Sequence, residues 1–242
     1  ESLQRTGSAD LAKSLQGKVS GIDIKSTSGM PGASSQIVIR GARSFTGDNT
    51  PLYVIDGVPI SNVSNAQGQP STPWTTRGGV DGGDGISNLN PEDIESINVL
   101  QGAAGSALYG SQAANGVVLI TTKKGKAGTS KIDFSVSYTN QGIAYEPNFQ
   151  NTYGQTPNAV TSWGAKLTTP AKNNLSEYFK NGHNTTTSIS LSSGSNIAQT
   201  YFSYANTSST GIQPNNKLVR NNFTFRETGR FLNDRLTVDV NT

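Results

Sequence analysis

The second half of the chain alternates apolar and polar side chains with a period of two. Successive side chains of a strand point to opposite faces, so this period predicts strands with one apolar and one polar face. Three segments show it clearly and two more weakly. Their apolar positions are Ile132, Phe134, Val136 and Tyr138; Ile189 and Leu191; Phe202 and Tyr204; Val219, Phe223 and Phe225; and Leu236, Val238 and Val240. The sequence therefore predicts mainly β-structure after Lys131.

Two architectures share this alternation. Segments of about ten residues with aromatic side chains near their ends are what strands of an outer-membrane β-barrel require. The strands of a soluble β-sandwich alternate in the same way, and alternation alone favours the sandwich. A transmembrane helix is excluded, because no run of apolar residues, glycine apart, exceeds four (52–55 and 117–120), whereas a membrane span needs about 20.

The first 128 residues predict a compact mixed α/β unit. Asp10 can cap a short helix that carries Leu11 and Leu15 on one face and ends near Gly17. An Asp-Gly pair between two apolar runs predicts a hairpin turn at Asp56, because both turn positions need a positive φ. Short strands are expected over residues 21–25, 36–40, 52–56 and 58–60.

The end of this unit has its own local signals. Asn90 followed by Pro91 and two acidic residues predicts a capped helical turn that leads into a strand over 94–100. An Ala-rich segment between two glycines predicts a helix over 103–109, and a buried strand should follow over 117–122. Residues 61–89 show no periodicity, so a long loop is expected there, and long loops are often functional.

Composition excludes several kinds of chemistry. Without cysteine the chain has no disulfide, thiolate metal site or cysteine nucleophile, and its one histidine, His183, lies in a segment predicted to be a polar turn. The net charge of +3 is too small to indicate nucleic-acid binding. The glycines of 81–85 and 102–110 lack the EF-hand and P-loop spacings. We expect no metal, no cofactor and no enzymatic activity.

Four strings in the first half then point to a family. They are LAKSLQGKVSGIDI (11–24), SGMPGASSQIVIRG (28–41), PLYVIDGVPI (51–60) and NPEDIESINVLQGAAGSALYGSQAANGVVLITTKKGK (90–126). In this order and spacing they resemble the plug domain of TonB-dependent outer-membrane transporters, in particular the SusC/RagA family of the Bacteroidetes. The resemblance implies an α+β plug over residues 1–128, followed over 129–242 by the first antiparallel strands of a transmembrane barrel.

A barrel of this family has about 22 strands, and residues 131–242 can supply only about five or six at ten residues each. A partial barrel would leave an unpaired edge in lipid, so the chain is expected to be part of a longer protein. Residues 148–180 lose the alternation and are either a long extracellular loop or a junction across missing residues. The chain begins at Glu1 without a leader pattern, so any signal sequence would have been removed.

The resemblance implies TonB-dependent import of a glycan or oligopeptide across the outer membrane of a Gram-negative bacterium. The plug gates the barrel, a SusD-like lipoprotein forms a lid, and the TonB-contacting segment would lie upstream of Glu1. One alternative is a plugged-barrel surface receptor or adhesin that binds without transporting. Another is a soluble periplasmic β-protein with an enzyme site. No nucleic acid is expected as a partner, and the substrate and oligomeric state stay open.

Two sets of residues are candidates for function. Arg40 matches an arginine that the family uses in a charge cluster between plug and barrel, and Glu95 matches the acidic partner region. Gln101 stands where the family commonly has Lys or Arg, which weakens the transfer of that cluster. In the 61–89 loop, substrate contacts are predicted at Trp74, by ring stacking, and at Arg77, Asp81 and Asp84, by hydrogen bonding. Lumen filling and solvated surface charge are the alternative roles.

Overall fold

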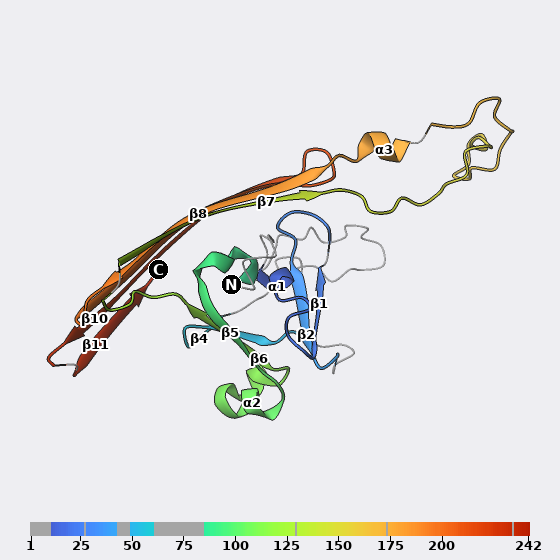
Figure 1. Cartoon of the computed structure of the whole chain (residues 1–242). Helices are drawn as coiled ribbons and strands as arrows, with labels where there is room; N and C mark the ends of the chain where they lie inside the picture. The colour runs from blue at the N-terminus through green and yellow to red at the C-terminus, as the bar shows by residue number, and fades with distance from the viewer. Residues whose placement is uncertain are drawn as a thin grey trace.

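The structure is a computed structural model that describes residues 11–26, 28–42, 49–60, 85–128, 130–172, 174–233 and 235–242. It consists of an α/β unit and a five-stranded antiparallel sheet that runs as one long, curved ribbon past that unit (Figure 1). The predicted combination of a mixed unit followed by antiparallel strands is therefore confirmed. None of the described helices is long and apolar enough to cross a membrane.

The α/β unit contains two small sheets. One joins β1 (Ile22–Ser26) and β2 (Ser35–Ile39), and the other has the strand order β4-β3-β6-β5. The second sheet consists of β3 (Leu52–Ile55), β4 (Val58–Ile60), β5 (Ile94–Leu100) and β6 (Val117–Thr122). Within it β3 and β6 are parallel, whereas β4 and β5 are antiparallel to their neighbours.

The turn between β3 and β4 has the predicted geometry. Asp56 has a φ of 48° and Gly57 a φ of 87°, and Ile55 pairs with Val58 across the turn. A two-residue turn with both φ values positive matches the twist of the flanking strands, and Asp tolerates this conformation better than most residues. The turn fixes Asp56 at the end of the sheet.

Local signals also set the helical segments. The Asn90 side chain accepts a hydrogen bond from Glu92 N over 3.2 Å and caps η4 (Pro91–Asp93). The helix α2 (Ala103–Tyr109) lies between the two predicted glycines and continues into η5 (Gly110–Ala113). The shorter η3 (Ile86–Asn88) precedes η4, and α1 (Leu11–Ser14) opens the described chain. The helical predictions for 90–93 and 103–109 are confirmed.

The unit has one main apolar core. Each large aliphatic or aromatic side chain buried there contributes about 1.5–3 kcal/mol relative to leaving it in water. Side chains of α1, both small sheets and η3 meet in it. Its most buried large side chains are Leu11, Ile37, Tyr53, Ile86, Val118 and Ile120. The α/β unit is thus packed around its own core and does not depend on the long sheet for one.

The long sheet is an up-and-down meander with the order β11-β10-β9-β8-β7. Its strands are β7 (Ser130–Gln141), β8 (Gly182–Gly194), β9 (Ala198–Thr210), β10 (Lys217–Phe231) and β11 (Leu236–Asn241). The two weakly patterned segments are full strands of 13 residues, β8 and β9. At the ends of β8 and β9 that lie nearest residues 142–181, both faces carry mainly hydroxyl and amide side chains. The apolar pattern therefore predicted strands that were too short.

The two faces of the sheet differ in the way that the alternation predicts. One face exposes apolar side chains, among them Phe134, Val136 and Phe223, which are 68%, 59% and 68% exposed. On the other face Tyr201, Ser203 and Thr207 are buried where the sheet meets the α/β unit. The polar face of the sheet is therefore its inner face.

The connections at the two ends of the sheet are unequal. Residues 142–181 join β7 to β8 and include α3 (Asn174–Tyr178), and they project beyond one end of the sheet (Figure 1). Short connections at 195–197 and 232–235 lie at the opposite end. Because β7 and β8 are hydrogen-bonded neighbours, residues 142–181 connect the two strands of a hairpin.

Candidate functional site

The candidate site is the contact between the α/β unit and the inner face of the long sheet. Its polar contacts fall into three groups, each centred on a short segment of the unit. We name them the Asp56 junction, the Asp93 junction and the carbonyl junction. The sheet residues involved come from β9, β10 and β11.

The Asp56 junction contains a nearly buried arginine, Arg226 of β10. Its guanidinium grips Asp239 of β11 in a two-point contact, Nε to Oδ1 over 3.0 Å and Nη2 to Oδ2 over 2.7 Å. Its remaining nitrogen, Nη1, lies 3.3 Å from Asp56 Oδ2 and donates to Thr122 Oγ1 over 3.0 Å. Arg226 thus joins a carboxylate of the sheet to a carboxylate of the α/β unit.

The Asp56 carboxylate has further donors. Thr122 gives it two hydrogen bonds, from the backbone N over 2.9 Å and from Oγ1 over 2.5 Å. The Asn241 side-chain amide of β11 donates to Oδ2 over 2.9 Å. The side chains of Arg226 and Asp56 are only 11% and 14% exposed, so the contact is shielded from solvent. Charge-assisted bonds in such surroundings are stronger than neutral ones.

The Asp93 junction buries a carboxylate at the end of η4. Tyr201 of β9 donates to Oδ1 over 2.9 Å, and Thr224 of β10 donates to Oδ2 over 3.0 Å. Asn90 adds a bond of 3.2 Å from within the unit. Asp93 and Tyr201 are both buried. Three neutral donors therefore compensate for the desolvation of this carboxylate.

The carbonyl junction uses the backbone of η3. Arg220 Nη1 donates to the carbonyl oxygen of Ser87, and Asn222 Nδ2 donates to that of Asn88 over 2.7 Å. Carbonyls at the end of a short helix lack partners within it, so they are available to side chains from outside. These contacts hold η3 against the middle of β10.

A regular pattern on β10 explains why this strand dominates the site. Arg220, Asn222, Thr224 and Arg226 occupy every second position and so share one face. The alternating apolar residues, Phe223 and Phe225, mark the other face. The predictions from the sequence rested on the apolar positions and did not include the polar ones between them. Arg226 directly follows Phe225, and adjacent residues of a strand point to opposite faces. This adjacency was the signal that could have placed Arg226 on the inner face.

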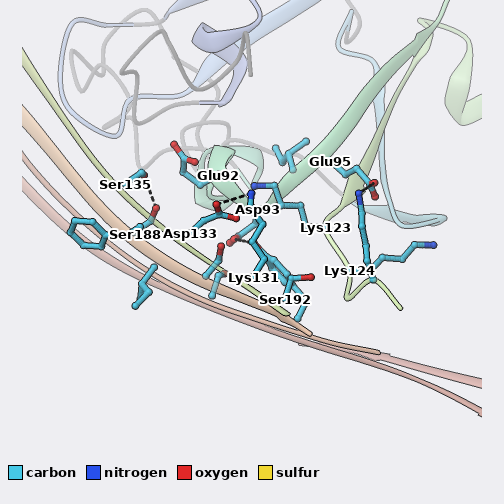
Figure 2. A pocket seen from close by; sticks show the side chains of 17 residues that line it. Glu92, Asp93, Glu95, Lys123, Lys124, Lys131, Asp133, Ser135, Ser188 and Ser192 are labelled. Atoms are coloured by element: carbon cyan, nitrogen blue, oxygen red, sulfur yellow. Dashed lines mark hydrogen bonds and ion pairs between the residues drawn. The ribbon is translucent and has the colours of Figure 1, made fainter. Parts of the chain in front are cut away.

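A polar cavity of about 510 Å³ lies beside the Asp93 junction, between η4–β5 of the unit and β7–β9 of the sheet (Figure 2). Serines line the sheet side, and the hydroxyls of Ser135 and Ser188 are 2.9 Å apart. Ser203 also lines the cavity, with its Oγ buried. The unit side carries charges, including Lys126, whose Nζ lies 3.9 Å from Glu95 Oε1.

Burial at this cavity also affects Glu92. Desolvation raises the pKa of the Glu92 carboxyl above its ordinary value of 4.5, and the nearby Lys123 opposes that rise. The neutral acid is thus more favoured in the folded protein than in the unfolded chain. Within the described ranges, no group of three or more histidine, aspartate or glutamate side chains could hold a metal ion.

The structure places Arg40 and Glu95 in separate contacts. Arg40 Nε donates to Gln101 Oε1 over 2.9 Å, and Gln101 Nε2 in turn donates to the carbonyl oxygen of Ser20 over 3.2 Å. Glu95 faces Lys126 at the cavity. In the described part of the chain these contacts stay within the α/β unit and do not bring the two residues together. Gln101, which departs from the family pattern, is the partner of Arg40.

The remaining sequence-based candidates differ in how they can be placed. Trp74, Arg77, Asp81 and Asp84 lie outside the described residues. His183 is part of β8, opposite Asn140 of β7, and not of a turn as the sequence indicated. The Thr-rich segment after His183 continues the strand. The His183 ring stacks on the ring of Tyr138, with centroids 6.4 Å apart.

Comparison with known proteins supports the resemblance. Residues 1–117 match the family described as TonB-dependent Receptor Plug Domain. The chain is 39% identical over 157 residues to TonB-dependent receptor SusC of Bacteroides thetaiotaomicron, which covers 63% of this chain and 14% of SusC. It is also 39% identical over 144 residues to TonB-dependent receptor P39 of Formosa agariphila, covering 58% of this chain and 12% of P39.

The structure is similar to that of the RagAB peptide transporter, with a TM-score of 0.75 and 26% sequence identity. This match covers 97% of the chain and 28% of the chain in that structure. The sequence thus spans a small part of the length of the proteins it matches. The similarity extends over both the α/β unit and the long sheet.

Proposed function

Because residues 1–117 match the family described as TonB-dependent Receptor Plug Domain, we propose that the complete protein is an energised importer in the outer membrane of a Gram-negative bacterium. Residues 1–128 form its plug, and residues 129–242 form the first strands and loops of its barrel wall. TonB contacts a segment upstream of Glu1 and remodels the plug, which lets the solute pass. The proteins that this chain matches are described as TonB-dependent receptors and a peptide transporter.

One observation carries this proposal: the plug lies on the polar face of a sheet whose other face is apolar and exposed. Lipid requires an apolar outer surface, and a water-filled lumen requires a polar inner one. Phe134 and Phe223 exemplify the outer face, and Tyr201 and Arg226 the inner face. A soluble sandwich would instead cover the apolar face with a second sheet.

The edges of the sheet support a larger barrel. Strands β7 and β11 each have one neighbour in the described structure, β8 and β10. Backbone groups at an open edge cannot be satisfied in lipid, so a membrane-spanning sheet has to close. The complete protein would have about 22 strands, and those beyond the five in the described structure would close the sheet into a barrel.

The substrate and the lid are proposed from the same similarity. We infer that the importer takes up a glycan or an oligopeptide and that a SusD-like lipoprotein covers its outer mouth. Outer-membrane barrels have short periplasmic turns and longer extracellular loops, so residues 142–181 belong on the outside. Trp163 and Tyr145 in this loop are 71% and 83% exposed, which suits contact with a partner or solute.

The sequence-based site residues keep their proposed roles. Arg40 and Glu95 contribute to a charge cluster between plug and barrel. Trp74, Arg77, Asp81 and Asp84 contact the solute. Outer-membrane lipid surrounds the exposed apolar face of the sheet.

Uptake by cells tests the import function. A strain that makes the complete protein and a strain lacking it would be given a panel of fluorescent oligosaccharides and oligopeptides, with and without an uncoupler of the proton gradient. Uptake of a panel member that needs both the protein and the gradient supports import. Binding of a panel member without accumulation would favour the surface-receptor alternative.

A further inference from the structure

At the Asp56 junction, the charged residue on the plug side and the charged residue on the wall side each have hydrogen-bond partners that belong to their own side. On the wall side, Arg226 holds Asp239 through two of its nitrogens, at 3.0 and 2.7 Å. On the plug side, Asp56 accepts two bonds from Thr122, at 2.9 and 2.5 Å. Neither set of bonds crosses from plug to wall.

Three contacts do cross. Arg226 Nη1 lies 3.3 Å from Asp56 Oδ2 and donates to Thr122 Oγ1 over 3.0 Å. Asn241 Nδ2 donates to Asp56 Oδ2 over 2.9 Å. If the plug leaves the wall these three are lost, while the Arg226–Asp239 pair and the Asp56–Thr122 bonds can persist.

This division lowers the free energy needed to separate the plug from the wall. Breaking a shielded ion pair is strongly destabilising when one charge is left without a partner. Arg226 would still face Asp239 after separation, so the wall would not hold an isolated cation. Asp56 would still accept from a backbone N–H and a hydroxyl, which stabilise a carboxylate.

The Asp93 junction follows the same plan with neutral groups. Asp93 keeps its bond from Asn90 at 3.2 Å when Tyr201 and Thr224 are withdrawn. The wall side then retains hydroxyl groups, which water can satisfy. Both junctions therefore fix the position of the plug by several directed bonds without trapping an unpaired charge.

We propose that the Asp56 junction is a reversible lock between plug and barrel wall, in which Asp239 is a positioning residue that stays with Arg226 when the plug moves. The two carboxylates on Arg226 then have opposite roles. Asp56 holds the plug closed, and Asp239 makes its release easier. This inference rests on the proposed role of residues 1–128 as a plug.

Two matched substitutions separate these roles. Asp56→Asn removes the charge that crosses to Arg226 and leaves the wall pair intact, so the plug should loosen. Asp239→Asn keeps a side-chain oxygen for Arg226 Nε but removes its charge, so Asp56 becomes the one carboxylate of the junction facing Arg226. Release of the plug would then strand Arg226, and the plug should be held more tightly. Asp23→Asn, in the exposed plug pair Lys25–Asp23, is the control.

The measurement uses the complete protein in planar lipid bilayers with KCl as the permeating probe. Urea is raised until the plug yields and conductance begins, and an intact barrel is checked by heat-modifiable mobility in gels. We expect conductance to begin at lower urea in Asp56→Asn, at higher urea in Asp239→Asn, and at the wild-type value in Asp23→Asn. Asn241→Ala, which removes the crossing bond of 2.9 Å to Asp56 Oδ2 without changing a charge, should follow Asp56→Asn and replaces it if that variant does not assemble.

Opposite shifts for the two aspartates support the lock. Shifts of both to lower urea would mean that they merely stabilise the fold, and that result would overturn the proposal. An unchanged onset in both Asp56→Asn and Asn241→Ala would overturn it as well. KCl conductance does not depend on import, so a lack of solute uptake by the wild type would refute the proposed function and leave this result standing.

Discussion

Tyr201 of β9 donates its hydroxyl hydrogen to Asp93 Oδ1 over 2.9 Å, although the two residues are 108 positions apart in the chain. Both side chains are buried where the α/β unit meets the long sheet. Because the bond joins the α/β unit to the long sheet, it forms only when the two are packed against each other.

Tyr201→Phe should weaken the contact between plug and wall. The substitution leaves a buried carboxylate oxygen with one donor fewer, which costs about 1–3 kcal/mol. We expect the plug of the complete protein to yield at lower urea, measured as the onset of KCl conductance. Tyr204→Phe is the control, because the Tyr204 hydroxyl donates to the exposed Asn221 over 3.0 Å on the sheet itself. Equal effects of the two substitutions would contradict the assignment.

Glu92 should make plug stability depend on pH. Its pKa is raised by burial, so the folded protein binds the proton more tightly than the unfolded chain does. The resulting stabilisation is complete below pH 4.5 and is lost as the pH rises through the raised pKa. Glu92→Gln removes this dependence and should make the plug more resistant to urea than wild type at neutral pH. If the difference in urea resistance between wild type and Glu92→Gln is the same at acidic and at neutral pH, the prediction is wrong.

Gly125 should not tolerate a side chain. A Cβ there would lie 2.5 Å from Thr200 N, 2.7 Å from the carbonyl carbon of Gln199 and 2.7 Å from Ser193 O, all backbone atoms of the sheet. Such overpacking costs about 1–3 kcal/mol. Gly125→Ala should therefore lower the thermal stability of the complete protein, measured by heat-modifiable mobility. Gly29→Ala meets no atom within 4 Å and should leave that stability unchanged.

Arg40→Ala tests the proposed charge cluster. If Arg40 also contacts strands of the complete barrel, its loss should loosen the plug and raise KCl leakage without preventing assembly. Gln101→Ala removes the 2.9 Å bond from Arg40 and the 3.2 Å bond to the Ser20 carbonyl, both within the plug, and should have the smaller effect. Unchanged leakage and unchanged uptake in Arg40→Ala would rule out the cluster role.

Local chemistry made much of the fold predictable. The Asp56-Gly57 turn, the Asn90 cap and the helix between Gly102 and Gly110 depend on residues that are close in sequence. The period of two also gave the strands of the sheet and the polarity of their faces. It predicted β8 and β9 to be shorter than they are, because their hydroxyl-rich ends lack an apolar face. For the same reason it placed His183 in a turn.

The candidate site depends on the tertiary structure. In the sequence, Asp56 is a suitable turn residue and Arg226 is one polar position on a strand; nothing local shows that they meet. The resemblance directed attention to Arg40 and Glu95, whose described contacts lie within the plug.

The sequence by itself determined the turns, the caps, the alternating faces and, through its motifs, the family resemblance, because these features arise from neighbouring residues. Only the tertiary structure decided which polar groups face each other across the interface. The residues that meet there lie more than a hundred positions apart, and the partner of each charge is fixed by how the two surfaces pack.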